Sequence, residues 1–248
     1  MSNYSPQRFA TLPQVIKNLL IINGLFFLAT IVSQSALRID LSDILGLHYP
    51  ASPQFKPLQF ISYMFMHGSF SHIFFNMFAL WMFGNVLENV WGPKRFLIYY
   101  FVTGMGAGLI HLLITYLRIQ QVSANLSPEL IEMVQSEGLA IINKGMNYSD
   151  PNMASLNELL HTATVGASGS VFGVLLAFGM MFPNSLIYIF FAIPVKAKWF
   201  VLGYGAFELY NGVMNQPGDN VAHFAHLGGM LFGFILIRYW KNGPKSYI

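Results

Sequence analysis

Four polar side chains could carry out acyl-transfer chemistry, and they stand near the starts of three apolar segments that are far apart in the chain. Ser168 offers a hydroxyl nucleophile, and His226 offers an imidazole that could accept its proton. His72 and Asn76 are four residues apart, so a helix would present both from one face. Strongly polar groups are costly inside apolar segments, so each of these residues is a candidate for a functional site.

Each of these residues also has a structural interpretation. Ser168 alone is more often a small packing residue than a nucleophile, and His72 alone is commonly a hydrogen-bonded structural histidine. We interpret His111 as structural because the sequence offers it no partner, and we assign His67 and His223 to loop or supporting roles beside the candidates. The arrival of three separate segments at a similar depth, more than any single residue, favours chemistry.

The composition indicates an integral membrane protein. The chain has 248 residues, of which 54% are hydrophobic and 9% are charged, whereas about 25% of the residues of a soluble domain are charged. Its mean hydropathy is +0.51. A net charge of +3 from scattered groups excludes a nucleic-acid-binding surface. The absence of cysteine excludes disulfides, thiolate metal sites and a cysteine nucleophile.

Six apolar segments are predicted to cross the membrane as helices, since about 20 residues at about 1.5 Å each reach across a hydrocarbon core about 30 Å thick. The first could alternatively be a cleavable signal peptide, but its apolar run is long for one. Residues 186–193 are also apolar, and we expect a re-entrant or interfacial piece there. The predicted fold class is therefore an all-α membrane protein, with spans at residues 18–37, 69–88, 96–117, 167–182, 199–212 and 222–240.

The charged residues predict the orientation of such a bundle. With six spans, most of the acidic residues fall on the side opposite the termini, the exceptions being Glu88 and Glu208. By the positive-inside rule, both termini are then expected in the cytoplasm. The side of the termini carries Arg8, Lys17, Lys94, Arg95, Lys196, Lys198, Arg238, Lys241 and Lys245, whereas the other side carries Arg38, Lys56, Arg118 and Lys144.

The chain is expected to form one helical domain over residues 18–240, between a cytoplasmic N-terminal segment at 1–17 and a cytoplasmic tail at 241–248. Residues 118–161 interrupt the apolar pattern, because they are rich in acidic residues and contain Ser-Pro and Asp-Pro helix starts. Apolar residues within them recur at helical spacing, which predicts a short amphipathic helix. We interpret this stretch as an insertion on the outer side.

Glycine pairs predict how the fourth and sixth spans pack. Gly169 and Gly173 are four residues apart and come directly after Ser168. Gly229 and Gly233 are also four residues apart and begin three residues after His226. Small residues at this spacing let two membrane helices approach closely. If the two spans pack through these glycines, Ser168 and His226 come within side-chain reach.

Three motifs resemble those of one known family. The run from His67 to Asn76 (HGSFSHIFFN) resembles the second-helix signature of the rhomboid intramembrane serine proteases, and residues 166–169 (GASG) are similar to their Gly-x-Ser-Gly nucleophile motif. Residues 222–229 (AHFAHLGG) resemble their sixth-helix motif, and residues 88–96 resemble the turn after the second helix. The motifs occur in the family's order, and the resemblance covers residues 60–233 except the insertion.

The resemblance implies a six-transmembrane-helix rhomboid bundle that cleaves transmembrane segments of other membrane proteins near the outer face. It implies Ser168 as nucleophile and His226 as general base, in a dyad without a carboxylate. The oxyanion would be stabilised by His72 and Asn76 with the backbone N–H of Ser168. Gly166, where the family's backbone approaches substrate closely, is also placed among the oxyanion residues. The supporting positions are Phe172, where many members have a Tyr packed on the catalytic histidine, His223 and Gly169.

The resemblance further implies no cofactor and no metal, with transmembrane protein substrates and membrane lipid as partners. Substrate is expected to enter beside the fifth span, and the location expected is a multi-pass position in the plasma or inner membrane of the cell. One alternative is a non-catalytic relative that binds membrane clients, although both Ser168 and His226 are present. Another is a metalloprotein or transporter built on the histidines, which the lack of a His-Glu-x-x-His motif and of a nearby carboxylate argues against.

Overall fold

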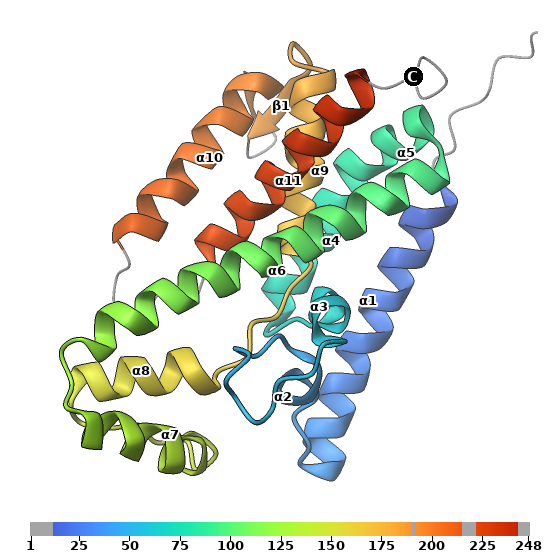
Figure 1. Cartoon of the computed structure of the whole chain (residues 1–248). Helices are drawn as coiled ribbons and strands as arrows, with labels where there is room; N and C mark the ends of the chain where they lie inside the picture. The colour runs from blue at the N-terminus through green and yellow to red at the C-terminus, as the bar shows by residue number, and fades with distance from the viewer. Residues whose placement is uncertain (1–11, 190–191, 215–221, 243–248) are drawn as a thin grey trace, which may run out of the picture.

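In the computed structural model, each of the six predicted spans is helical (Figure 1). The structure describes residues 12–189, 192–214 and 222–242, so the expectations for residues 1–11 and 243–248 lie outside it. The long helices are α1 (Gln14–Val32, continued by the π-helical turn Ser33–Leu37), α4 (Phe70–Ala79, continued by the π-helical turn Leu80–Gly84 and by α5, Asn85–Trp91), α6 (Pro93–Ser123), α9 (Ser168–Met181), α10 (Ala197–Met214) and α11 (His223–Asn242).

Three of these helical segments are long and apolar enough to cross a membrane: Gln14–Leu37, Phe70–Trp91 and Pro93–Ser123. Ser168–Met181 is apolar but shorter. Their outward faces carry large apolar side chains, as on α1, where Leu25 is 60% exposed. Exposed apolar surface of this extent marks contact with a membrane or another protein, and together with the composition it identifies a helical membrane protein.

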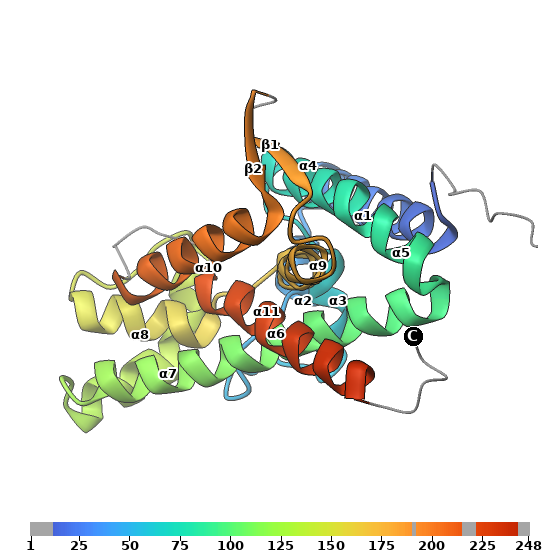
Figure 2. The same ribbon diagram turned by 90° about the horizontal axis from the view of Figure 1, so that it is seen from above.

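The bundle is organised around α9, which is seen end-on near the centre of Figure 2 with the other long helices around it. Helix α11 packs against both α6 and α9. A Cβ on Gly229 of α11 would collide with the backbone of Gly169 on α9, so the close approach predicted for this pair is confirmed. The other two glycines face α6 instead, because a Cβ on Gly173 would meet Thr103 and one on Gly233 would meet Tyr99.

The insertion forms two helices beside the extended end of α6 (Figure 1). Helices α7 (Pro128–Ile142) and α8 (Pro151–His161) begin at the two proline signals, and the Asp150 carboxylate accepts hydrogen bonds from two backbone N–H groups of the first turn of α8. The predicted amphipathic helix is α7, whose Val134 is fully buried in a small separate cluster with Met153 and Leu156 of α8.

Residues 186–196 contain a β-hairpin, which the all-α prediction did not include. Strands β1 (Leu186–Ile189) and β2 (Ile193–Lys196) pair antiparallel, with Leu186 opposite Lys196. The run Leu-Ile-Tyr-Ile is rich in residues that favour strands, and Pro194 is tolerated because a two-stranded ribbon has only edge strands. In the apolar segment predicted as a re-entrant or interfacial piece (186–193), residues 186–189 and 193 lie in strands, and residues 190–191 lie outside the described part of the chain.

A buried carboxylate ties the start of α1 to α5. Glu88 is 3% exposed, and its two carboxylate oxygens accept hydrogen bonds from the backbone N–H groups of Val15 (2.9 Å) and Ile16 (2.8 Å). The first N–H groups of a helix have no partner inside the helix, and its N-terminus favours negative charge. Glu88 thus satisfies two donors that would otherwise be buried without an acceptor.

We expect Glu88→Ala to lower the free energy of unfolding by about 1–3 kcal/mol, because it leaves these buried donors unpaired. The thermal midpoint of the purified protein in detergent measures the loss. Glu132→Ala, which removes an exposed carboxylate from α7, is the matched control and should leave the midpoint unchanged. Equal midpoints for both variants would contradict the proposed anchoring.

Candidate active site

The turn that carries Ser168 is held from two sides before α9 begins. Leu47, in the loop after α2 (Leu41–Leu45), exchanges backbone hydrogen bonds of 2.8 and 2.9 Å with Thr164. The N–H of Gly166 donates to the carbonyl oxygen of Tyr63 (2.9 Å), in the 3-10 turn Tyr63–Phe65 that follows α3 (Gln59–Ser62). Ser168 is then the first residue of α9. The position of the Ser168 hydroxyl is therefore fixed by two segments, at Leu47 and Tyr63, that lie more than 100 residues before it in the chain.

His111 contributes to the same turn. Its Nε2 lies 2.7 Å from the Oγ1 of Thr164. The sequence offered His111 no partner, and the structure provides one from the segment that leads into α9. This contact agrees with the structural interpretation of His111.

The structure brings Ser168 and His226 together. The Oγ of Ser168 lies 2.9 Å from the Nε2 of His226, which is 8% exposed. The two residues come from α9 and α11, next to the glycine contact between Gly169 and Gly229. This is the separation at which an imidazole can accept the proton of a hydroxyl.

An aromatic ring orients the imidazole. The rings of Phe172 and His226 are stacked with centroids 4.1 Å apart and an interplanar angle of 7°, which is the stacking expected from the sequence. Tyr204 of α10 lies against the same phenylalanine, with centroids 5.0 Å apart. The stack limits rotation of the His226 ring out of its plane.

His72 reaches the same site through the space left by Gly166. The glycine has φ +138°, and a Cβ built on it would lie 2.9 Å from the Nε2 of His72 and 3.4 Å from the Oγ of Ser168. A side chain at position 166 would therefore occupy the space between the imidazole and the hydroxyl. The backbone angle itself lies in a region that favours glycine.

The side-chain amide of Asn76, which was expected to donate to an oxyanion, already donates one hydrogen bond within its own helix. It is buried one turn after His72, and its Nδ2 donates to the carbonyl oxygen of His72 (2.9 Å). An amide nitrogen has two hydrogens, so one remains for another acceptor.

His67 packs against His72 from outside the helix, with ring centroids 5.0 Å apart. Burial, reinforced by His72, lowers the pKa of His67 to about 4, so this ring is neutral at physiological pH.

A carboxylate lies at the other edge of His226, and the expectation that none is near the histidines is wrong. Glu208 of α10 is 3% exposed, and its Oε2 accepts hydrogen bonds from the Nδ1 of His226 (2.8 Å) and from the Nδ1 of His223 (2.7 Å). The sequence did carry a signal, since Glu208 is an ionisable residue inside the predicted span 199–212, and such residues are functional candidates by default. Its partners lie on the next helix along the chain.

The same three groups are the candidate metal ligands of this region. Donor atoms of Glu208, His223 and His226 all lie within 4.8 Å of one another. Imidazole and carboxylate groups are ligands that zinc accepts. In the structure the carboxylate instead accepts hydrogen bonds from both rings, so these groups satisfy one another directly.

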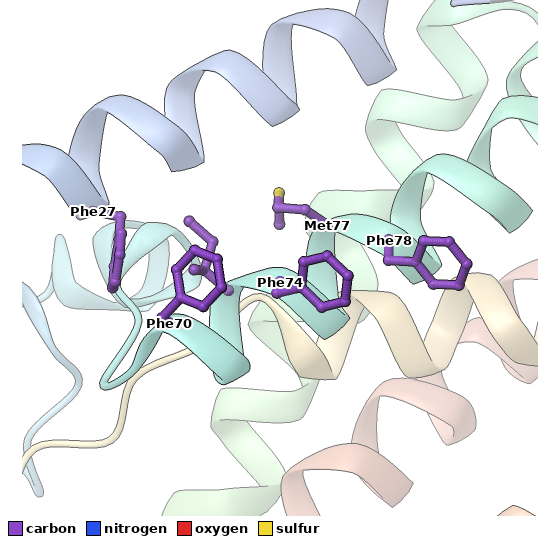
Figure 3. Close-up of a pocket in the computed structure, with 6 residues that line it drawn as sticks. Phe27, Phe70, Phe74, Met77 and Phe78 are labelled. Carbon is purple, nitrogen blue, oxygen red and sulfur yellow. The ribbon is translucent and has the colours of Figure 1, made fainter. Parts of the chain in front are cut away.

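A shallow apolar groove lies along α4 on the side that faces α1, away from Ser168 and the histidines (Figure 3). It contains none of the candidate chemical residues, and its lining fits lipid or an apolar side chain. The lining residues are Phe27, Phe70, Ile73, Phe74, Met77 and Phe78.

Comparison with known proteins identifies the family. A family model described as Rhomboid domain matches residues 54–241. The chain is 27% identical over 172 residues to RHOMBOID-like protein 12, mitochondrial, of Arabidopsis thaliana, covering 68% of this chain and 42% of the relative. It is also 27% identical over 190 residues to Rhomboid protein 1, mitochondrial, of Saccharomyces cerevisiae, covering 76% of this chain and 43% of the relative.

An uncharacterized mitochondrial rhomboid protein of Schizosaccharomyces pombe is 24% identical over 205 residues, covering 72% of this chain and 50% of the relative. The chain thus spans half or less of the length of these curated relatives. All three carry names that place them in mitochondria, so they give no support to the expected plasma-membrane location. The match over residues 54–241 agrees with the resemblance seen in the motifs, and this chain belongs to the rhomboid family.

Proposed function

We propose that the chain is an intramembrane serine endopeptidase that cleaves transmembrane segments of other membrane proteins. Membership of the rhomboid family supports this activity at the level of the family. The observation that carries the proposal for this chain is the 2.9 Å contact between the Oγ of Ser168 and the Nε2 of His226. A nucleophile in direct contact with a base is the arrangement that acyl transfer requires.

In the proposed reaction, Ser168 attacks the carbonyl carbon of a substrate peptide bond while His226 takes the hydroxyl proton on Nε2. The negative charge that develops on the carbonyl oxygen is stabilised by the His72 imidazole, the backbone N–H of Ser168 and the second hydrogen of the Asn76 amide. His226 then gives its proton to the leaving amine. Water attacks the acyl-enzyme with His226 again acting as base, which releases the second product and restores Ser168.

The proposed topology places this reaction near the outer surface. With six spans and both termini in the cytoplasm, Ser168 opens a helix that runs inward from the outer side, and His226 lies in the first turn of another. Water then has a short path to the acyl-enzyme. A substrate helix must unwind locally to present a peptide bond, so helix-weakening residues near its outer end should favour cleavage.

We expect Ser168→Ala to abolish cleavage without lowering the thermal midpoint, because the change removes the only nucleophile of the proposed reaction. The assay uses the purified protein in liposomes with a labelled single-span peptide carrying Gly and Pro near its outer end. Ser136→Ala, on the exposed face of α7, is the matched control and should retain full activity. Wild-type cleavage by Ser168→Ala would disprove the serine mechanism.

Covalent labelling tests the same serine without a substrate. A fluorophosphonate probe should label the wild-type protein and Ser136→Ala but not Ser168→Ala. A wild-type protein that is folded yet never labels or cleaves would favour the non-catalytic, client-binding alternative.

We expect His72→Ala to lower kcat by about 10²–10³-fold with little change in KM, as is typical when one oxyanion donor is removed. Asn76→Ala should cause a smaller loss, because one of its N–H groups is already bound to the helix backbone. Steady-state kinetics on the liposome assay separate the two parameters. A rise in KM with unchanged kcat would instead assign His72 to ground-state binding.

A further inference from the structure

Helix α10 is exposed along most of its length, yet it buries one carboxylate. Among the residues of α10, only Ala197, Val201, Glu208 and Gly212 are buried, and they form a single stripe at spacings close to multiples of a helical turn. Figure 2 shows α10 at the edge of the bundle beside α11. Three of the four are residues that pack by size or apolar surface, so Glu208 is the exception that needs a chemical reason.

Burying a carboxylate in a membrane helix is costly unless it is paired and hydrogen-bonded. Glu208 meets this condition through the Nδ1 atoms of His226 (2.8 Å) and His223 (2.7 Å). An ionised carboxylate only accepts hydrogen bonds, so both Nδ1 atoms carry their hydrogens.

The contact with Glu208 decides the state of the opposite nitrogen of His226. A neutral imidazole with its hydrogen on Nδ1 has a lone pair on Nε2, and this Nε2 faces the Oγ of Ser168. The carboxylate therefore selects the one neutral tautomer that can take the proton of the serine. An anchor whose sole task was to hold α10 against α11 could contact His223 alone, without touching His226.

We propose that Glu208 is a positioning residue that completes a Ser168–His226–Glu208 triad. The proposal rests on the proposed function. The proton of Ser168 moves to the Nε2 of His226 as the Oγ–carbon bond forms, and Glu208 stays ionised beside the imidazolium that results. The stacked Phe172 restrains the plane of the ring, whereas Glu208 sets which nitrogen is the base.

The triad couples catalysis to the position of α10. Ser168 and His226 belong to α9 and α11, which are locked together at Gly169 and Gly229, but Glu208 belongs to α10. A displacement of α10 would withdraw the carboxylate while leaving the glycine contact intact. Ser168 and His226 would then remain in contact, but no carboxylate would keep the hydrogen of His226 on Nδ1 and the lone pair on Nε2.

We expect Glu208→Gln to lower kcat by about 10²–10⁴-fold with KM nearly unchanged, because the amide can donate to Nδ1 and stabilise the wrong tautomer. Glu208→Asp, which keeps the carboxylate one methylene shorter, should recover at least about 10-fold of this loss. Glu132→Gln, at an exposed position of α7, is the control that should keep wild-type kinetics. Thermal midpoints and fluorophosphonate labelling rates are measured in parallel.

Two kinetic outcomes would overturn the triad. One is a kcat for Glu208→Gln within about twofold of the wild type. The other is a loss of kcat that is equal in Glu208→Gln and Glu208→Asp and is accompanied by a lowered thermal midpoint in both. That result would assign Glu208 a structural role alone. These kinetic measurements follow the Ser168→Ala experiment, which shows first whether cleavage depends on the serine. If cleavage is lost in Ser168→Ala but unaffected in Glu208→Gln, the triad fails while the proposed function stands.

A measurement on the unmodified protein covers the case in which the Glu208 variants do not fold. The ¹⁵N chemical shifts of labelled histidine distinguish the two neutral tautomers, and the His226 signals are assigned by their loss in His226→Gln. The triad requires hydrogen on Nδ1 and a lone pair on Nε2. A His226 ring with its hydrogen on Nε2 would overturn it.

Discussion

The contact between α9 and α11 at Gly169 and Gly229 is the constraint on which the candidate site depends. A Cβ on Gly229 would collide with the backbone of Gly169, so the two helices approach at a distance that only glycine allows. Ser168 directly precedes one glycine, and His226 lies about one turn before the other. A hydrogen bond of 2.9 Å tolerates little separation of the helices that carry its two atoms. The geometry of the contact between Ser168 and His226 is thus set by backbone packing.

A second constraint follows from the low charge of the chain. Polar groups inside the bundle cannot rely on water, so they satisfy one another across helices. The hydroxyls of Tyr63, Tyr99 and Ser170 donate to backbone carbonyl oxygens of other helices, at 2.6, 2.8 and 2.7 Å. Glu88 and Glu208 each accept two hydrogen bonds, one carboxylate at the start of α1 and the other beside the histidines. The same type of residue thus holds the start of a helix at one place and, in the proposed triad, orients a base at another.

The six helices and the helical insertion were predictable because they rest on local patterns. The pairing of Ser168 with His226 was expected from motifs that resemble those of a known family. The contact of Glu208 with the histidines was not recognised, since its position was used only to assign the orientation of the bundle. Its partners are 15 and 18 residues away on the following helix, beyond the periodicity of one helix. The β-hairpin was missed for a different reason, because a short apolar run fits a strand and a buried helical piece equally well.

The sequence by itself determined the class of protein, the positions of the long helices and the residue types available for chemistry. Hydropathy, helix starts and motif spacing are properties of neighbouring residues, and the chain carries them before it folds. Only the tertiary structure decided that Gly173 and Gly233 face α6 and that Glu208 reaches the Nδ1 of His226. It also decided that the missing side chain of Gly166 leaves room between His72 and Ser168. These facts are distances between segments remote in the chain, and they are fixed by how side chains of different helices fill space together.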